Sequence, residues 1–232
     1  MKRGQAASLN PRKNPQQRRS RDTIDTIFEA TIQVLLANGF DQTTTTQIAE
    51  RAGVSIGSLY QYFPNKRALM AAIVRRHVSG VVDATIAACE SAHGKSIEAM
   101  CATIIDAFVD AKTRRPDASR ALYLPTAAVN GDTIVKEESS RCAQAIQDML
   151  MTASDANFEQ PHLVSSVLVA SIVGPTRAAI EAGGNRSTFD ALKLHLTALC
   201  VGYLKEVSLL AVGRRGASAS APARSAAQAL SE

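Results

Sequence analysis

The chain has 232 residues, 46% of them hydrophobic, and a net charge of +5, which suits one or two domains with a sizeable core. Aromatic residues make up only 4% of it, Ala is abundant and no run alternates in the manner of a strand, so we expect an all-α protein. The sequence has no signal-peptide pattern and no apolar run near the ~20 residues of a membrane span. These features argue against export and membrane insertion and predict a cytoplasmic protein.

Positive charge is concentrated in the first third of the chain. Residues 1–80 hold 12 Lys and Arg against 5 acidic residues, whereas residues 81–232 hold 14 against 16. This asymmetry is the footprint expected of a DNA-binding segment, although a charge run is more often a solvated surface. Residues 1–19 are basic and contain little to bury, so we expect a disordered arm, of a kind that can enter a minor groove.

A first helix is predicted over about residues 22–38. Its apolar residues recur at helical spacing and share one face: Ile24, Ile27, Phe28, Thr31 and Leu35. Asn38-Gly39 supplies a helix stop signal. The next two helices are short and lie close together, so three helices over residues 22–63 can share one small core.

The segment after this helix is typical of a helix-turn-helix. Thr44 and Gln47 have the spacing of a capping box at the start of a two-turn helix. Gly53 stands where the chain needs a left-handed residue to reverse direction, and Ser55 can cap the following helix. In that helix Leu59 and Phe63 are four residues apart and should point into the core. The opposite face carries Ile56, Gly57, Ser58, Tyr60, Gln61 and Tyr62.

Lys66 is placed unfavourably for an isolated helix. Pro64 ends the preceding helix and Asn65 can cap the next, which puts the ammonium of Lys66 in a first turn, against the macrodipole. A DNA phosphate beside Lys66 would reverse the sign of this interaction. The alternative is a solvated lysine.

The run TTTTQIAERAGVSIGSLYQYFPNKRALM, preceded by IFEATIQVLLANGFDQTT, resembles the DNA-binding domain of TetR-family transcriptional regulators. The resemblance covers about a quarter of the chain. It implies a homeodomain-like three-helix domain over residues 20–66, followed by a C-terminal helical bundle over 67–212 for ligand binding and dimerisation. The DNA-binding residues it implies are Thr45, Thr46, Ser55, Ile56, Gly57, Ser58, Tyr60, Gln61, Tyr62 and Lys66.

These residues also have plainer interpretations. A Tyr beside a Phe in a short helix is more often core than contact, and one threonine hydroxyl is needed as a cap. Tyr60 adjoins the inward Leu59 and cannot share its direction. Gly57 has no side chain and Ile56 is apolar, so base recognition would depend on Ser58, Gln61, Tyr62 and a thymine-methyl contact from Ile56.

Further helices are expected to the end of the bundle. Their predicted ranges are 66–91, 96–113, 117–124 (stopped by Pro125), 132–152, 161–181, and Ser187 or Thr188 to about Leu210. Asn130-Gly131-Asp132 is predicted to be a turn, with Asp132 capping the helix after it. Residues 213–232 are Ala/Ser-rich and are predicted to be a disordered tail.

The last two long helices are apolar over more than one narrow stripe. A helix that is apolar on most sides must be covered on most sides, and one body of this size offers limited cover. We therefore expect a homodimer formed through residues 161–210, as the resemblance also implies, with a large monomeric core as the alternative. A two-fold dimer would bind a pseudo-palindromic site on double-stranded DNA.

The resemblance places a small-molecule effector site among the middle helices, roughly residues 96–182. Aromatic, thioether and basic side chains are the candidates for its lining: Met100, Phe108, Tyr123, Met149, His162 and Arg177. Taken singly, each is more often a core or surface residue. An Arg177 buried in an apolar helix would need a partner, either an acidic ligand or a neighbouring Glu.

The predicted function is a DNA-binding transcriptional regulator, in the first place a repressor released from its operator by an effector, with the helix over 66–91 as the lever. An activator of the same fold, or an architectural DNA-binding protein without effector, is the alternative. We find no phosphate-binding loop, nucleophile elbow or HExxH pattern, so no enzyme activity or cofactor is expected. Cys89, Cys101, Cys142 and Cys200 form no CxxC pair, which argues against a metal site and favours small core residues.

Overall fold

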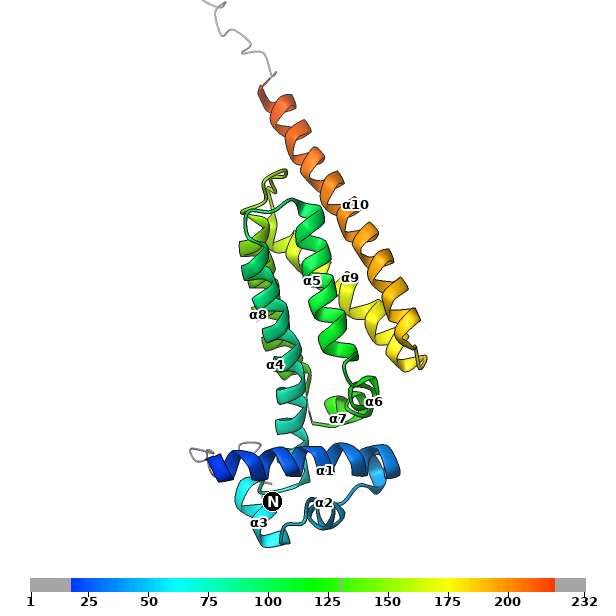
Figure 1. Ribbon diagram of the computed structural model, residues 1–232. Helices are drawn as coiled ribbons and strands as arrows, with labels where there is room; N and C mark the ends of the chain where they lie inside the picture. The colour runs from blue at the N-terminus through cyan, green and yellow to red at the C-terminus, as the bar shows by residue number, and fades with distance from the viewer. Residues whose placement is uncertain (1–17, 130, 220–232) are drawn as a thin grey trace, which may run out of the picture.

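The computed structural model describes residues 18–129 and 131–219 and shows a small helical head below a taller helical body (Figure 1). The described residues form ten helices and no strand, as the predicted all-α class requires. The helices are α1 Arg18–Gln42, α2 Thr45–Ala52, α3 Ile56–Tyr62, α4 Lys66–Ala92, α5 Ile97–Thr113, α6 Pro116–Ala121, α7 Tyr123–Ala128, α8 Gly131–Leu150, α9 Pro161–Glu181 and α10 Arg186–Ala219. Most of the predicted arm and the tail from residue 220 lie outside the described residues.

Helix α4 connects the head to the body. It begins directly after α3, rises from the head and runs between α5 and α8 (Figure 1). Asn65 caps it by accepting a hydrogen bond from the Ala68 amide at 2.8 Å. Its lower turns bury Leu69 and Met70 in the head, and its upper turns bury Val81 and Cys89 in the body. A single helix therefore spans both cores.

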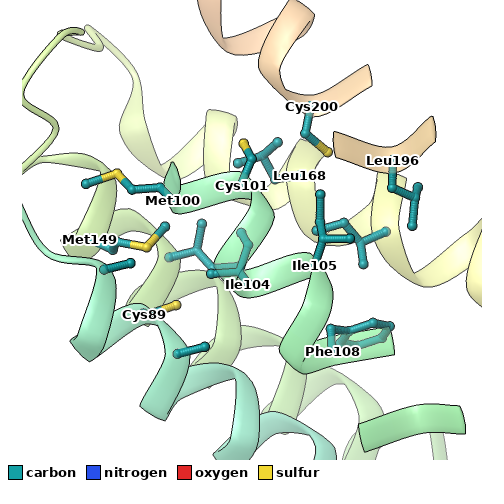
Figure 2. Packing of buried hydrophobic residues seen from close by; sticks show 14 of the residues in the cluster. Cys89, Met100, Cys101, Ile104, Ile105, Phe108, Met149, Leu168, Leu196 and Cys200 are labelled. Atoms are coloured by element: carbon teal, nitrogen blue, oxygen red, sulfur yellow. The ribbon is translucent and has the colours of Figure 1, made fainter. Parts of the chain in front are cut away.

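The body core lies where α4, α5, α8, α9 and α10 meet (Figure 2). Met100, Ile104 and Ile105 of α5 are fully buried at its centre, and Met149, Leu168 and Leu196 pack on them from three other helices. The four cysteines are buried and free, as expected of small core residues. Burial raises the pKa of each thiol to about 11 or 12, so the thiols stay protonated and poorly reactive at neutral pH.

The head core is not confined to the first three helices. Ile27, Leu59 and Phe63 form its centre, as predicted, but Leu122 and Ile134 of the body belong to the same buried cluster. The short helices α6 and α7 lie between α1 and the rest of the body (Figure 1). The head is thus packed on the body as well as tethered to it.

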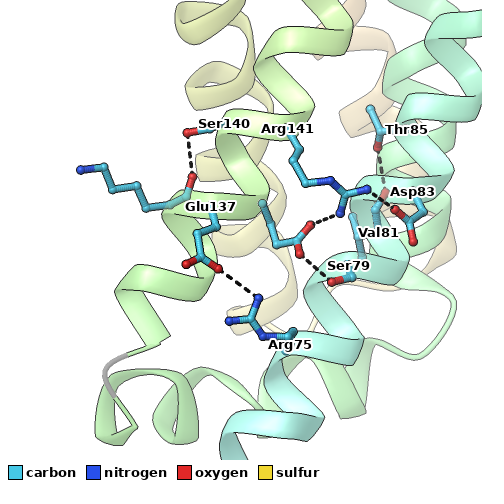
Figure 3. A network of polar contacts seen from close by, with 10 residues as sticks. Arg75, Ser79, Val81, Asp83, Thr85, Glu137, Ser140 and Arg141 are labelled. Atoms are coloured by element: carbon cyan, nitrogen blue, oxygen red, sulfur yellow. Dashed lines mark hydrogen bonds and ion pairs between the residues drawn. The ribbon is translucent and has the colours of Figure 1, made fainter. Parts of the chain in front are cut away.

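Helices α4 and α8 are joined by a polar network (Figure 3). The buried Glu138 carboxylate accepts a hydrogen bond from the Ser79 hydroxyl at 2.8 Å and pairs with Arg141 at 2.5 Å. Arg141 also pairs with Asp83 at 2.8 Å. Because a buried carboxylate is costly without such partners, the network fixes the register of α8 along α4.

The structure corrects several predicted helix boundaries. Pro125 does not stop a helix, because it lies in the first turn of α7, where its missing N–H costs nothing. The preceding short helix begins at Pro116 and not with Asp117 as its cap. Helix α8 already starts at Gly131, which places Asp132 inside its first turn rather than at its cap; Asn130 lies outside the described residues.

The last helix also differs from its predicted range. The Asn185 side chain accepts a hydrogen bond from the Thr188 amide at 3.0 Å, so Asn185, and not Ser187 or Thr188, caps α10. The helix continues to Ala219, well beyond the predicted end near Leu210 and into the predicted disordered tail. At the other end of the chain, α1 already begins at Arg18, inside the predicted arm.

Helix α9 is the one helix of the described ranges that is long and apolar enough to cross a membrane by length and composition. It packs against α8 and α10 in the body. Its apolar residues are unevenly covered, since Leu168 is buried whereas Leu163 and Val173 are exposed. One side of this helix is therefore accessible in the single chain, and its cover by a second chain stays a prediction.

Candidate nucleic-acid interface and ligand cavity

The turn between α2 and α3 has the geometry that its sequence predicts. The Thr44 hydroxyl accepts a hydrogen bond from the Gln47 amide at 3.2 Å, and the Gln47 side chain accepts one from the Thr44 amide at 2.9 Å. Gly53 has a φ of 66°, in the left-handed region, and its N–H closes the C-terminal end of α2. The capping box and the glycine together fix the angle at which α3 leaves α2.

Helix α3 presents one face to the core and the other to solvent. Ser55 caps it, because its hydroxyl accepts a hydrogen bond from the Ser58 amide at 3.0 Å. Leu59 is completely buried, and the Phe63 ring packs on the Phe28 ring of α1 with centroids 5.6 Å apart. Ile56, Gly57, Tyr60 and Gln61 are exposed, and Ser58 is half-buried. The outward face is therefore the one predicted from the sequence.

Tyr60 links this exposed face to the start of α2. Its hydroxyl is hydrogen-bonded to the Thr45 hydroxyl, with 3.0 Å between the oxygens. Two side chains expected to contact DNA are thus held together before any DNA is bound. Thr46 is exposed beside them, whereas Thr43 is buried and donates its hydroxyl hydrogen to the Gly39 carbonyl at 2.6 Å. Of the threonine run, Thr46 is exposed and Thr45 half-buried, whereas the exposed Thr44 uses its hydroxyl as the cap of α2.

Tyr62 has a mixed position. Its ring is half-buried and lies 6.4 Å from the Phe63 ring, and it packs against the head core. Both interpretations of this residue, core and contact, are therefore partly met. A DNA contact by Tyr62 stays a prediction.

Lys66 has a partner that the sequence did not reveal. Its ammonium donates a hydrogen bond to the Phe40 carbonyl at 2.8 Å and lies 4.6 Å above the centre of the Phe40 ring. The ammonium thus binds a backbone carbonyl near the C-terminal end of α1, where Gly39 leaves the helical conformation. Burial lowers the pKa of Lys66, and Asp41 opposes this effect. This contact accounts for a lysine at a helix start without DNA, so a phosphate contact would be an additional role.

A cavity of about 250 Å³ lies in the body, enclosed by α4 to α9. Apolar side chains of α4, α5 and α9 form much of its wall, among them Val74, Val78, Phe108, Val169 and Val173. It also borders the segment from α6 to α7, which packs beneath the body and against α1 and α4. The cavity is therefore placed between the body core and the head.

The predicted lining residues are divided by the structure. Phe108, Tyr123 and Arg177 line the cavity together. Met100 and Met149 do not, because both are completely buried in the body core beside α8 and α9. His162 is also excluded, since it is exposed in the first turn of α9, remote from this wall. Arg177 is not the buried residue expected: it is exposed at the mouth, pairs with Glu181 at 2.8 Å, and stacks 4.7 Å from the centre of the Tyr123 ring.

The polar lining residues missed from the sequence include His77 of α4, Lys112 of α5 and Ser119 of α6. The Lys112 ammonium lies 3.2 Å from His77 Nε2, and the Ser119 hydroxyl donates to the Lys112 carbonyl at 2.7 Å. Burial, with Arg177 nearby, lowers the pKa of Lys112 to about 8, and burial beside Lys112 lowers the pKa of His77 to about 4. The only sequence signal was a lysine on the half-buried side of an amphipathic helix, which alone does not indicate a ligand site.

A second cavity, of about 340 Å³, separates α1 from the body. Two ion pairs bridge it: Arg115 with Glu29 at 2.5 Å, and Arg76 with Asp25. The Arg115 pair lowers the pKa of the Glu29 carboxyl and raises that of Arg115. His77, Val81 and Leu122 line this head–body cavity as well as the first one, so the two spaces share a wall of three side chains.

The fold and the exposed face of α3 define a helix-turn-helix protein. The model for "Bacterial regulatory proteins, tetR family" matches residues 27–73, and that for "Tetracyclin repressor-like, C-terminal domain" matches residues 96–204. Together these two segments cover the head and most of the body. The chain therefore belongs to the TetR family of bacterial regulatory proteins, a class of DNA-binding transcriptional regulators.

Individual relatives agree with this assignment. The HTH-type transcriptional regulator YvkB of Bacillus subtilis is 39% identical over 59 residues, which are 25% of this chain and 31% of that protein. The HTH-type transcriptional activator FasR of Mycolicibacterium smegmatis is 25% identical over 150 residues, 64% of this chain and 68% of FasR. The alignment with YvkB thus spans less than a third of that relative.

A solved structure shares the fold over about three quarters of the chain. The transcriptional regulator FadR from Bacillus subtilis, in complex with stearoyl-CoA, superposes with a TM-score of 0.64 at 15% identity. The match covers 76% of this chain and 97% of that one. At this identity the likeness establishes the fold alone, from head to body.

Proposed function

We propose that the protein is a dimeric, cytoplasmic repressor that binds a pseudo-palindromic operator through α3 and is released by a small molecule bound among α4 to α9. The observation that carries the DNA-binding part is the exposed face of α3, on which Tyr60 is already hydrogen-bonded to Thr45 of α2. Such a pre-arranged pair can meet the phosphates at the edge of a major groove without first being ordered.

The DNA-binding part is tested by selecting bound duplexes from random DNA and measuring affinity for the selected site. Tyr60→Phe removes only the hydroxyl and should weaken binding by about fivefold, the value of one hydrogen bond near 1 kcal/mol. Thr133→Val, which removes an exposed hydroxyl from α8, is the control and should bind like the natural protein. Equal affinity of the Tyr60→Phe variant would remove Tyr60 from the interface, and protection of DNA without sequence preference would favour an architectural protein.

Dimerisation is supported by apolar surface on the last two helices. Leu163 and Val173 of α9 are exposed, as are Leu194 and Leu199 of α10, with Leu194 at 75%. Large apolar side chains gathered on one side of a soluble bundle commonly mark an interface. We expect sedimentation at micromolar concentration to give the mass of two chains, and a monomer there would contradict the proposal.

The effector part rests on the position of α4. His77 and Val78 of this helix line the cavity, while Leu69 and Met70 of the same helix belong to the head core. The segment before α6 adds a second connection, because Arg115 binds Glu29 of α1 while Ser119 lines the cavity. A ligand that prefers one placement of α4 and α6 would shift the population of head positions and so the affinity for DNA.

An activator remains the second candidate for the sign of regulation, because FasR is described as a transcriptional activator. A promoter fusion carrying the selected operator distinguishes the two. Repression predicts higher reporter output when the gene for this protein is deleted, and activation predicts lower output. Equal operator affinity with and without a saturating ligand of the cavity would contradict effector control for either sign.

A further inference from the structure

The cavity between α4 and α9 is lined by two chemically different sets of side chains. One set is aliphatic and aromatic and includes Val74, Val78, Val81, Phe108 and Val169. The other carries basic and hydroxyl groups from five helices: His77 of α4, Lys112 of α5, Ser119 of α6, Tyr123 of α7 and Arg177 of α9. A molecule that satisfies both sets must itself be amphipathic.

Lys112 is a half-buried cation with no acidic partner. None of the carboxylates in the described ranges forms an ion pair with it, and its polar neighbours are His77 Nε2 at 3.2 Å and the Tyr123 ring, whose centre is 5.3 Å away. An ammonium has three hydrogens to donate, and His77 can accept only one of them. A buried charge in this state is costly, and an anion is the group that would relieve the cost.

The other titratable groups near Lys112 are a neutral imidazole, a cation already paired with a carboxylate, and one exposed carboxylate. His77 stays neutral at pH 7, because its pKa is lowered to about 4, and so it cannot balance the ammonium. Arg177 of α9 is a second cation; it is partly neutralised by Glu181. Asp132 of α8 lines the same cavity but is exposed.

The Tyr123 hydroxyl provides a second, independent sign of a missing partner. It is enclosed by protein yet has no hydrogen-bond partner among the described residues. Burial raises its pKa to about 12, so the hydroxyl keeps its hydrogen and can donate it. A buried donor left unpaired costs about 1–3 kcal/mol, which makes such groups rare unless a ligand completes them.

We infer that the cavity binds a small organic monoanion, with an anionic oxygen pair held by Lys112 and the Tyr123 hydroxyl and an apolar body against the valines of α4 and α9. A carboxylate has the charge and the acceptor oxygens for this arrangement. The volume of about 250 Å³ lies just below the roughly 300–1,000 Å³ of sites for drug-sized ligands. It therefore suits a single ring or a short chain and is too small for an acyl-CoA. This inference deepens the proposed function by naming the class of effector, but its test needs no DNA.

The test compares acids with their neutral counterparts on the full chain by calorimetry at about pH 7. Octanoate is paired with octanol, and phenylacetate with phenylethanol, so that each pair differs in the charged group. We expect at least one acid to bind tenfold or more tightly than its alcohol, since a charged hydrogen bond is worth at least this factor. The affinity for the acid should fall as the pH rises above about 8, because Lys112 then loses its proton.

Variants identify the groups responsible. Lys112→Met should lower the affinity for the acid by at least about tenfold, leave the alcohol unaffected or bound more tightly, and raise the melting temperature of the ligand-free protein. Tyr123→Phe keeps the ring and should lower the affinity for the acid about fivefold. Lys136→Met, which removes an exposed lysine of α8, is the charge-matched control and should change neither affinity nor melting temperature.

Two outcomes would overturn the inference. One is a natural protein that binds no acid of the set more tightly than its alcohol, and the other is a Lys112→Met variant that keeps the full affinity for the acid. Neither outcome affects the proposed regulator if another molecule releases it from its operator. Conversely, a chain that binds octanoate at Lys112 but selects no DNA sequence would refute the regulator and leave the anion site intact.

Discussion

The head and the ligand cavity of this protein are specified in different ways. The DNA-facing surface is held together by hydrogen bonds between residues close in the sequence. Thr44 is bonded to Gln47, Ser55 to Ser58, and Tyr60 of α3 to Thr45 of the preceding helix. The cavity is assembled from helices α4 to α9, whose contributing residues range from Val74 to Arg177. Its chemistry exists only once those helices have packed.

The two regions also differ in how their polar groups are satisfied. In the head, the N-caps form their hydrogen bonds, and the Lys66 ammonium donates one to the Phe40 carbonyl. In the cavity, Lys112 lacks a carboxylate and the Tyr123 hydroxyl lacks any partner in the described ranges. Polar groups that already have their partners suit a rigid DNA-binding surface. Polar groups without partners suit a ligand site, because the protein gains stability when a ligand binds there.

The largest expected effect compares the packing of the head core with that of the cavity wall. Leu59→Ala removes a completely buried side chain from the tight head core and should cost about 2–5 kcal/mol of unfolding free energy. Val78→Ala, at the wall of an existing cavity, should cost about 1 kcal/mol, because fewer contacts are lost. Urea unfolding followed by circular dichroism gives both values. Similar costs for the two substitutions would show that the cavity wall is packed as tightly as the head.

The next effect tests the half-buried imidazole of His77 between the regions. The unfolded chain protonates His77 near pH 6.5, whereas the folded protein resists protonation until about pH 4. Between these values the unfolded state binds more protons, so this residue makes the protein lose stability as the pH falls. Each unit of pKa difference corresponds to about 1.4 kcal/mol. At about pH 4.5 the loss of unfolding free energy should therefore approach 2 kcal/mol.

Comparison with His77→Gln isolates that contribution from the titration of carboxylates. The stability of the natural protein relative to the variant should decline between about pH 7 and pH 4.5, by about 2 kcal/mol. A constant difference over this range would mean that His77 is more hydrated than its place between two cavities implies. Urea midpoints at the two pH values provide the measurement.

The smallest effect concerns the helix cap at the start of α2 in the head. Thr44→Ala removes the cap of α2 and should cost about 1 kcal/mol. Thr133→Ala, at an exposed position in the first turns of α8, has no such role and should cost less than about 0.5 kcal/mol. If both substitutions have the same small effect, tertiary packing and not the capping box sets the start of α2.

The contrast explains which parts could be predicted from the sequence. Gly53, Thr44, Ser55 and Asn65 act within three or four residues of themselves, and each has the predicted geometry. The helix ends at Thr113 and Glu181 were predictable for the same reason. Pro125 misled because a proline is compatible with a first turn as well as with a stop, and only packing decides between the two.

Prediction of the cavity was less successful because it is a long-range property. Met100 and Met149 were reasonable candidates by chemistry, but packing turned them into the centre of the core. Lys112 was overlooked because a lysine on an amphipathic helix is usually a solvated residue. Its meaning depends on His77, Tyr123 and Arg177, which three other helices bring to it.

His77 is the polar member of the wall that it forms with Val81 and Leu122 between two chambers. On one side lies the space beneath α1, crossed by the Arg115–Glu29 bridge, and on the other the enclosure lined by Lys112. Replacing His77 with a small side chain would thin this wall and leave Val81 and Leu122 as its remaining members. The barrier between the underside of the head and the interior of the body would then be entirely apolar.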